Sequence, residues 1–382
     1  MEHLLLVNIR LTVLGPDDAF GRFPEVAAQA DARIAAHLGL AKRALLLKRV
    51  ACAHRASPFT GIFVSREDSV EAAADIAAHL GVAWNSQAAV QRMQNKWLTR
   101  QTLSKAGLRQ PAYRLCASED DLLRLLDSQA GAWIVKPLVG TGSRGISRAT
   151  TAHDVAPAVA HVRTVQPTGS FLVEGSLEPA REYSVEGVWV GGRPHVLAVT
   201  AKETTGPPRF VELGHTLPVT LGDELDAEVR TTVMRGLALL GAAHGLFHVE
   251  VFVDRDGVVF GEAHRRAGGD RITQLLQLAG VDLHGLALDG SYRPVPASMA
   301  ELERVAAVRY FRFPPGTLRH LAGVDALAQE PDVVFCQVDV HPGESHRSRC
   351  CTPSAATAAL SSPAPLTRRQ LRAPIGCAIW SR

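Results

Sequence analysis

The chain has 382 residues, of which 46% are hydrophobic, and this is enough to build two or three packed subdomains. Forty-one Lys and Arg oppose 38 Asp and Glu, and a formal charge of +3 is too balanced to indicate a nucleic-acid or membrane surface. The six cysteines show no CxxC pair and no spacing typical of a disulfide framework or zinc site. We therefore expect a globular protein of the reducing cytoplasm that binds neither nucleic acid nor membrane.

Residues 1–90 are predicted to form an N-terminal α/β domain. The apolar run from Leu4 to Ile9 is too short to span a bilayer and lacks the features of a signal peptide, so it predicts a buried first strand. Strand-like and helical runs then alternate, which favours a mostly parallel sheet. One helix carries an apolar stripe from Val70 to Leu80 and is expected to stop at Gly81.

Residues 91–300 are predicted to form a second domain, whose small lobe covers about residues 115–190. A helix from Lys96 to Ala106 ends at Gly107, and another begins at Ser118 with an acidic residue three positions later. The lobe looks α+β because strands follow in hairpin-like order. These strands are predicted at Ala132 to Lys136, Ser170 to Glu174, Glu182 to Val190 and Pro194 to Ala201.

A large lobe is expected over about residues 191–300, with residues 301–342 as its C-terminal part. A helical stretch from Asp226 to Ala243 leads into a hairpin of Phe247 to Val253 and Val258 to Glu262. Residues 343–382 show no sustained periodicity and are predicted to form an irregular tail. Two interpretations compete: a disordered segment, or a C-terminus whose reading frame differs from that of its relatives.

The hairpin indicates a metal site if its turn is a three-residue loop. Asp254 then pairs with Val258, and Glu250 lies directly opposite Glu262, with Cβ atoms about 5 Å apart. Two carboxylates at that spacing repel each other unless a cation lies between them, and oxygen-only ligands suit magnesium. Alternation adds His264 and Arg266 to the same face. A two-residue loop would break the pairing, and a solvated outer face explains these charges about as well.

A glycine-rich loop follows the strand that ends at Lys136. Its residues Gly140, Gly142 and Gly145 allow the backbone to approach phosphate oxygens, and Ser143 can add a donor. The loop is neither a Walker sequence nor a dinucleotide fingerprint, and a surface turn explains it about as well. Burying Lys136 at the end of an apolar strand is costly unless its ammonium meets an anion such as phosphate.

Taken in order, these motifs resemble the ATP-grasp superfamily over about residues 60–300, and within it the carboxylate-amine ligase branch that includes amino-acid ligases. The resemblance implies α/β and α+β architecture: an N-terminal parallel α/β subdomain and two α+β subdomains that clasp ATP. The segments that carry it are Asn95-Lys96, Ile134 to Pro137 with Gly140 to Gly145, Val173 to Leu177 with Arg181 to Glu186, Glu250, and Glu262 to Asp270.

The resemblance also implies a nucleotide site. Lys96 and Lys136 would contact the phosphates and base, and the loop from Gly140 to Gly145 would close over the phosphates, where Ser143 counts among both the binding and the catalytic residues. Glu174 and the backbone up to Leu177 would line the adenine pocket. Glu182 would accept hydrogen bonds from the ribose hydroxyls.

The same resemblance assigns the catalytic centre. Glu250 and Glu262 would hold Mg²⁺, with Mn²⁺ as a substitute, and His264 stands where the family often has an asparagine, so it could ligate the metal or bind phosphate or substrate. Arg266 would stabilise the transferring phosphoryl group. Lys202 and His215 fall in the segment that borders the substrate in similar ligases.

The function implied is ligation of a small-molecule carboxylate to an amine, both expected to be amino acids, through an acyl phosphate with release of ADP and phosphate. A phosphotransferase or carboxylase on the same scaffold is the first alternative. A catalytically silent nucleotide-binding protein is the second. A homodimer is the only oligomer we consider, and the sequence does not select the substrates.

Overall fold

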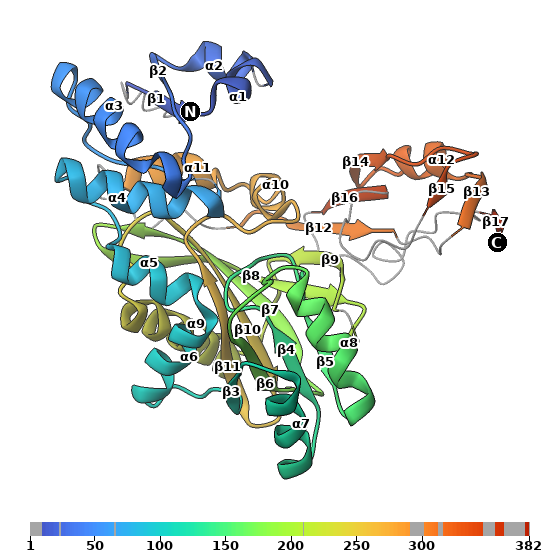
Figure 1. Cartoon of the computed structure of the whole chain (residues 1–382). Coiled ribbons are helices and arrows are strands. Elements are labelled where there is room, and N and C mark those ends of the chain that lie inside the picture. Colours follow the sequence, from blue (N-terminus) through green and yellow to red (C-terminus); the bar gives the residue numbers. More distant parts are fainter. Residues whose placement is uncertain are drawn as a thin grey trace. The chain divides into compact units, whose positions relative to one another are not determined.

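The computed structural model describes residues 10–22, 24–64, 66–208, 210–290, 302–311, 316–346, 356–362 and 379–381. The chain divides into two units, Met1–Val90 and Gln91–Arg382 (Figure 1). The strand predicted from Leu4 to Ile9 lies outside the described residues. None of the described helices has the length and apolar character needed to cross a membrane.

The first unit contains a parallel pair of strands, β1 (Thr12–Gly15) and β2 (Ala32–Ala35). The predicted helix is confirmed as α4 (Val70–Leu80), and it ends where Gly81 takes a left-handed φ of 69°. Its apolar stripe packs against α3 (Arg43–Ala56) and the strand pair. The remaining helices are α1 (Asp17–Arg22), α2 (Pro24–Gln29), the short η1 (Leu40–Lys42) and η2 (Glu67–Ser69), and α5 (Gln87–Gln94), which runs into the second unit.

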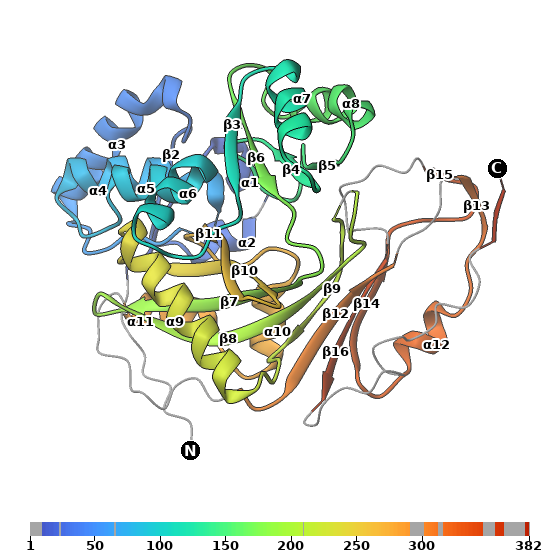
Figure 2. The same ribbon diagram turned by 90° about the horizontal axis from the view of Figure 1, so that it is seen from below.

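The small lobe of the second unit is a four-stranded antiparallel sheet covered by two helices. Its strand order is β3 (Tyr113–Cys116), β6 (Phe171–Gly175), β4 (Trp133–Lys136) and β5 (Ser147–Ala149). Helices α7 (Glu119–Ser128) and α8 (Ala152–Arg163) lie side by side on it (Figure 2). The predicted helix start is confirmed, because Ser118 and Asp121 form a capping box. The hairpin-like order is wrong for β6, which pairs with β3 and β4 and not with the next strand.

The large lobe is built on an eight-stranded sheet in the order β11-β10-β7-β8-β9-β12-β16-β14. Helix α9 (Asp223–Leu240) packs on one face, and α10 (Ile272–Leu278) and α11 (Leu283–Gly290) belong to a separate apolar cluster. The strands are β7 (Arg181–Val190), β8 (Arg193–Thr204), β9 (Glu212–Leu217), β10 (Leu246–Asp254), β11 (Gly257–His264), β12 (Val305–Tyr310), β14 (Val333–Val338) and β16 (Ala356–Ser362).

The C-terminal residues differ from the expected irregular tail. Strand β16 pairs with both β12 and β14 and so belongs to the large sheet. Two further short strands, β15 (Ser345–His346) and β17 (Ile379–Ser381), flank β13 (Gly316–His320), and helix α12 (Val324–Ala328) packs against β14. The sequence of β16, ATAALSS, has small residues and no clear alternation, so only its long-range pairing identifies it as a strand.

The hairpin of β10 and β11 has a shorter turn than predicted. Asp254 pairs with Gly257, so the loop has two residues and the predicted pairing of Asp254 with Val258 is wrong. A β-bulge compensates: Val249 pairs with Ala263 and Val251 with Phe260, so Glu250 faces Gly261 and Glu262 together. A Cβ on Gly261 would lie 2.6 Å from the carbonyl oxygen of Glu250, so the bulge requires glycine.

Candidate functional site

One face of the large sheet is polar where β7, β8 and β10 run side by side. On β7, Tyr183 and Val185 belong to the core beneath α9, whereas Glu182, Ser184 and Glu186 alternate with them on the opposite face. The register places Ser184 opposite Glu250 of β10. Side chains predicted from distant parts of the sequence therefore gather on this face.

Lys202 of β8 is the centre of a first cluster. Its ammonium group pairs with Glu182, with Glu212 (3.0 Å) and with Glu250 (2.8 Å), and its side chain is 5% exposed. Burial disfavours the charged lysine, but the three carboxylates outweigh burial and raise the pKa of Lys202 well above its usual value. We call these four residues the Lys202 cluster.

The Lys202 cluster carries more negative than positive charge. Burial raises the pKa of Glu212 to about 7, and one of its carboxylate oxygens has no hydrogen-bond partner among the described residues. Glu250 behaves differently, because Lys202 and then His248 outweigh burial and lower its pKa well below the usual value. Burial also raises the pKa of Glu182, so these crowded carboxylates favour a proton or a further cation beside Lys202.

A second cluster lies between the two lobes of the second unit. Lys96 pairs with Glu262 (2.9 Å), and Lys136 pairs with Glu174 (2.6 Å) and lies 3.6 Å from Glu262. Glu174 also receives the guanidinium of Arg100 at 2.6 Å. Burial alone would raise the pKa of Glu174, but Arg100 and Lys136 lower it to about 2. The two predicted phosphate-binding lysines are thus brought together with a predicted metal ligand.

Strand alternation explains why Lys136 and Glu174 face this cluster. Trp133 and Val135 of β4 pack against α7 and α8, so Lys136 lies on the opposite face of the small sheet. On β6, Val173 is in that core and Glu174 lies opposite it. The charged face of the small sheet therefore meets the large lobe.

The glycine-rich loop begins at this second cluster. The ammonium group of Lys96 donates to the carbonyl oxygen of Gly140 (2.9 Å). Gly140, Gly142, Ser143 and Gly145 all have positive φ angles, of 153°, 68°, 52° and 75°. Such a backbone turns successive N–H groups out of any regular pairing, which is the arrangement of an anion-binding loop.

The two carboxylates on β10 and β11 fit a magnesium ion that is shared with phosphates. Mg²⁺ in proteins is typically held by one or two carboxylates, and phosphate oxygens and water complete its shell. Among the described residues no group of three or more His, Cys, Asp or Glu side chains could hold a metal. The ring of His264, the third predicted ligand, lies 5.8 Å from that of His248.

Three predicted residues lie at the margins of these clusters. Strand β11 ends at His264, so strand alternation does not extend to Arg266, which is half-buried and donates to the carbonyl oxygen of Ala267 (2.7 Å). Leu177 is in the connection between β6 and β7 and is partly exposed. His215 of β9 is buried, and its Nε2 lies 3.9 Å from Asp270.

Sequence reasoning missed several buried polar residues of the site. Arg100 bridges Glu174, Gln110 and the carbonyl oxygen of Phe260, and it lies one helical turn after Lys96 on α6 (Lys96–Lys105). His248 pairs with Glu186 at 2.9 Å, where Glu186 and then Glu250 outweigh burial and raise the pKa of His248 to about 9. The signal for Glu186 was present as polar residues alternating with apolar ones on β7.

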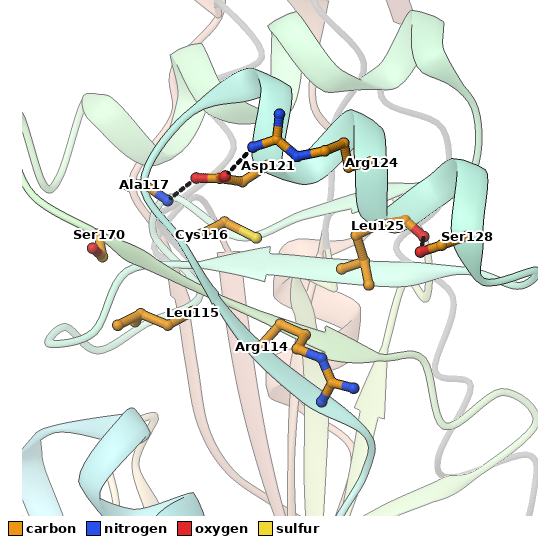
Figure 3. A pocket seen from close by; sticks show the side chains of 9 residues that line it. All are labelled: Arg114, Leu115, Cys116, Ala117, Asp121, Arg124, Leu125, Ser128 and Ser170. Carbon is orange, nitrogen blue, oxygen red and sulfur yellow. Dashed lines mark hydrogen bonds and ion pairs between the residues drawn. The ribbon is translucent and has the colours of Figure 1, made fainter.

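A cavity of about 320 Å³ lies away from both clusters, at the edge strand β3 and helix α7 (Figure 3). Cys116 lies in its wall, and burial raises the pKa of that thiol to about 11, so it is not a ready nucleophile. Of the charged lining residues, Asp121 and Arg124 pair with each other at 2.6 Å, and Arg114 donates to the carbonyl oxygen of Tyr113 at 2.8 Å. The cavity adds nothing to the chemistry of the clusters.

Comparisons with known proteins give one family match and several relatives. Residues 130–274 match the family model described as an ATP-grasp domain. The chain is 29% identical over 260 residues to the uncharacterized protein y4rH of Sinorhizobium fredii, which covers 65% of this chain and 52% of that protein. It is 26% identical over 193 residues to a formate-dependent phosphoribosylglycinamide formyltransferase of Flavobacterium psychrophilum. That match covers 48% of this chain and 47% of the relative. The matches thus span about half the length of these relatives.

Solved structures show the same fold. An L-amino acid ligase from Bacillus licheniformis superposes with a TM-score of 0.74 at 18% identity, covering 93% of this chain and 94% of that one. An N5-carboxyaminoimidazole synthetase from Staphylococcus aureus gives a TM-score of 0.66 at 15% identity, covering 92% and 87%. At these identities the likeness concerns the fold.

Proposed function

Because this chain has the ATP-grasp fold and carries an ATP-grasp domain over residues 130–274, we propose that it is an ATP- and magnesium-dependent ligase that joins a carboxylate to an amine. The observation that supports this most is the pairing of Lys96 with Glu262 beside Lys136, because it unites phosphate-binding cations with a magnesium-type carboxylate. ATP as a substrate favours a cytoplasmic location.

In this proposal the second cluster receives the nucleotide. Lys96 and Lys136 exchange part of their contacts with Glu262 for phosphate oxygens, and the loop from Gly140 to Gly145 closes over those phosphates. Glu174, held by Arg100, fixes Lys136 in place and lines the adenine pocket together with the chain as far as Leu177. Glu182 accepts hydrogen bonds from the ribose hydroxyls. It can turn away from Lys202 because that ammonium group still pairs with Glu212 and Glu250.

Glu250 and Glu262 are the proposed ligands of Mg²⁺, or Mn²⁺ in its place, which neutralises phosphate charge when bound. Arg266 stabilises the phosphoryl group as it moves to the substrate carboxylate and then leaves as phosphate. Lys202 and His215 border the carboxylate substrate, and Ser143 adds a hydroxyl donor from the loop. Amino acids are the proposed substrates, in keeping with the amino acid ligase whose fold this chain shares.

The decisive experiment measures ADP release by the purified protein with ATP and Mg²⁺ against amino acids offered singly and in pairs. We expect release that depends on two particular substrates, with a condensed product identified by mass. A phosphorylated or carboxylated product would replace the ligase by a phosphotransferase or carboxylase. ATP binding without substrate-dependent release would leave only the nucleotide-binding role.

A further inference from the structure

His215 has unused hydrogen-bonding capacity deep in the protein. Its side chain is 3% exposed, and neither ring nitrogen has a hydrogen-bond partner among the described residues. Tyr310 packs edge-on against the ring at 6.1 Å, and Nε2 lies 3.9 Å from the carboxylate of Asp270. That gap is too wide for a hydrogen bond. Leaving a buried polar group without a partner is costly, so this position is suited to a ligand that fills the gap.

Asp270 is held beside His215 by a strained and clamped backbone. Asp270 and Arg271 have left-handed φ angles of 50° and 65°, which non-glycine residues rarely adopt. The hydroxyl of Tyr310 donates to the carbonyl oxygen of Asp270 (2.6 Å). The guanidinium of Arg271 stacks on Phe335 at 4.2 Å and donates to Gln337. Contacts from strands β12 and β14 therefore hold the backbone on which Asp270 is carried.

The Asp270 carboxylate is charged and open to solvent on one side. Burial opposes its ionisation, but His215, then Lys202 and His248, lower its pKa. Its side chain is 40% exposed, and within the described part of the chain no lysine or arginine lies at ion-pair distance from it. A single carboxylate next to one imidazole is too small a donor set for a metal, and it repels a second carboxylate. The ligand that fits this pair is therefore an organic cation.

We propose that Asp270 and His215 bind the ammonium group of the amine substrate. One nitrogen can lie about 2.9 Å from both Nε2 and the aspartate oxygen, and it can donate to each. Asp270 follows Arg266 by four residues across Gly268-Gly269, so the proposed amine site and the proposed phosphoryl-binding arginine belong to one short connection after β11. The inference rests on the proposed ligase function and defines the acceptor as an amine that is protonated in solution.

The test compares two nucleophiles of different charge. Hydroxylamine is uncharged near neutral pH and traps acyl phosphates as hydroxamates, whereas glycinamide is largely an ammonium ion. Each is supplied with ATP, Mg²⁺ and a panel of L-amino acids as carboxylate donors. For Asp270→Asn we expect the use of glycinamide relative to hydroxylamine, as kcat/KM, to fall tenfold or more through a higher KM. Asp270→Glu restores part of that preference.

Matched controls separate binding from folding. Asp127→Asn changes an exposed aspartate on α7 and should keep the wild-type preference. Tyr310→Phe removes only the clamp on the Asp270 carbonyl and should lower the preference by less than Asp270→Asn. A preference unchanged in Asp270→Asn, or an equal loss with both nucleophiles, overturns the ammonium site while the ligase stands. Absence of hydroxamate with every donor in the wild-type protein refutes the ligase, and the ammonium site with it.

Discussion

The protonation states of individual charged residues in this site are set by partners on other strands. Glu250 is ionised because Lys202 and His248 face it, while Glu212 on the same lysine binds a proton near neutral pH. The two glutamates differ by environment and not by type. A substitution at one of them therefore shifts the charge of the others, and double variants are expected to be non-additive.

Glu262→Gln keeps the size of the side chain and removes its charge. We expect ADP release to fall about 100-fold or more, because a charged magnesium ligand contributes several kcal/mol to the transition state. Thermal unfolding should change far less than turnover. Glu224→Gln, an exposed position at the start of α9, is the matched control in steady-state kinetics. Equal turnover in both variants contradicts the assignment of Glu262.

The lowered pKa of Glu174 predicts that the folded protein loses a defined part of its free energy of unfolding in acid. Its pKa falls from 4.5 to about 2 on folding, so its ionisation stabilises the folded state above pH 4.5, and this contribution is lost as the pH falls toward 2. Between pH 6 and pH 3 the wild-type protein should lose about 2 kcal/mol more than Glu174→Gln. Urea unfolding at both pH values measures this, and parallel losses in the two proteins rule it out.

At the scale of elements, local signals predicted what local interactions decide. The stop of α4 at Gly81 and the capping box of Ser118 follow from a few neighbouring residues, and both appear as expected. The turn of the β10–β11 hairpin does not follow from neighbouring residues. A two-residue turn with a bulge and a three-residue turn without one place Glu250 near Glu262 equally well. Only cross-strand packing chooses between them.

Gly261→Ala tests the bulge. A methyl group 2.6 Å from the carbonyl oxygen of Glu250 must push the two strands apart, so we expect a destabilisation of about 1–3 kcal/mol and weaker Mg²⁺ binding. The comparison is Gly269→Ala, where an added Cβ meets nothing within 4 Å. Chemical denaturation of the two variants should separate them, and identical midpoints would show that the bulge tolerates a side chain.

At the scale of the whole molecule, the proposed nucleotide and metal residues all belong to the second unit, Gln91–Arg382. The sequence indicated the order of these residues. It did not indicate roles for Arg100, Glu212 and Asp270, because their partners are far away in the chain. Arg100 reaches Phe260 across 160 positions, and no periodicity encodes such a contact. Strand β16 was not predicted for the same reason.

A shortened chain of residues 91–382 should still bind the nucleotide. Every residue that we assign to ATP lies between Lys96 and Arg266, so its affinity for an ATP analogue is expected to stay within a factor of about ten, or 1.4 kcal/mol, of the full chain. Calorimetric titration with Mg²⁺ present measures it. A folded fragment, judged by circular dichroism, that fails to bind would assign a role in nucleotide binding to residues 1–90.

The two clamps on the loop of Asp270 come from β12 and β14, and β16 lies between these strands. Local opening of that edge would release Tyr310 and Phe335 while leaving β10 and β11, at the other end of the sheet, paired. The protein would then activate its carboxylate without capturing the amine. Under the proposed function, the far edge of the sheet would therefore decide whether ATP consumption stays coupled to bond formation.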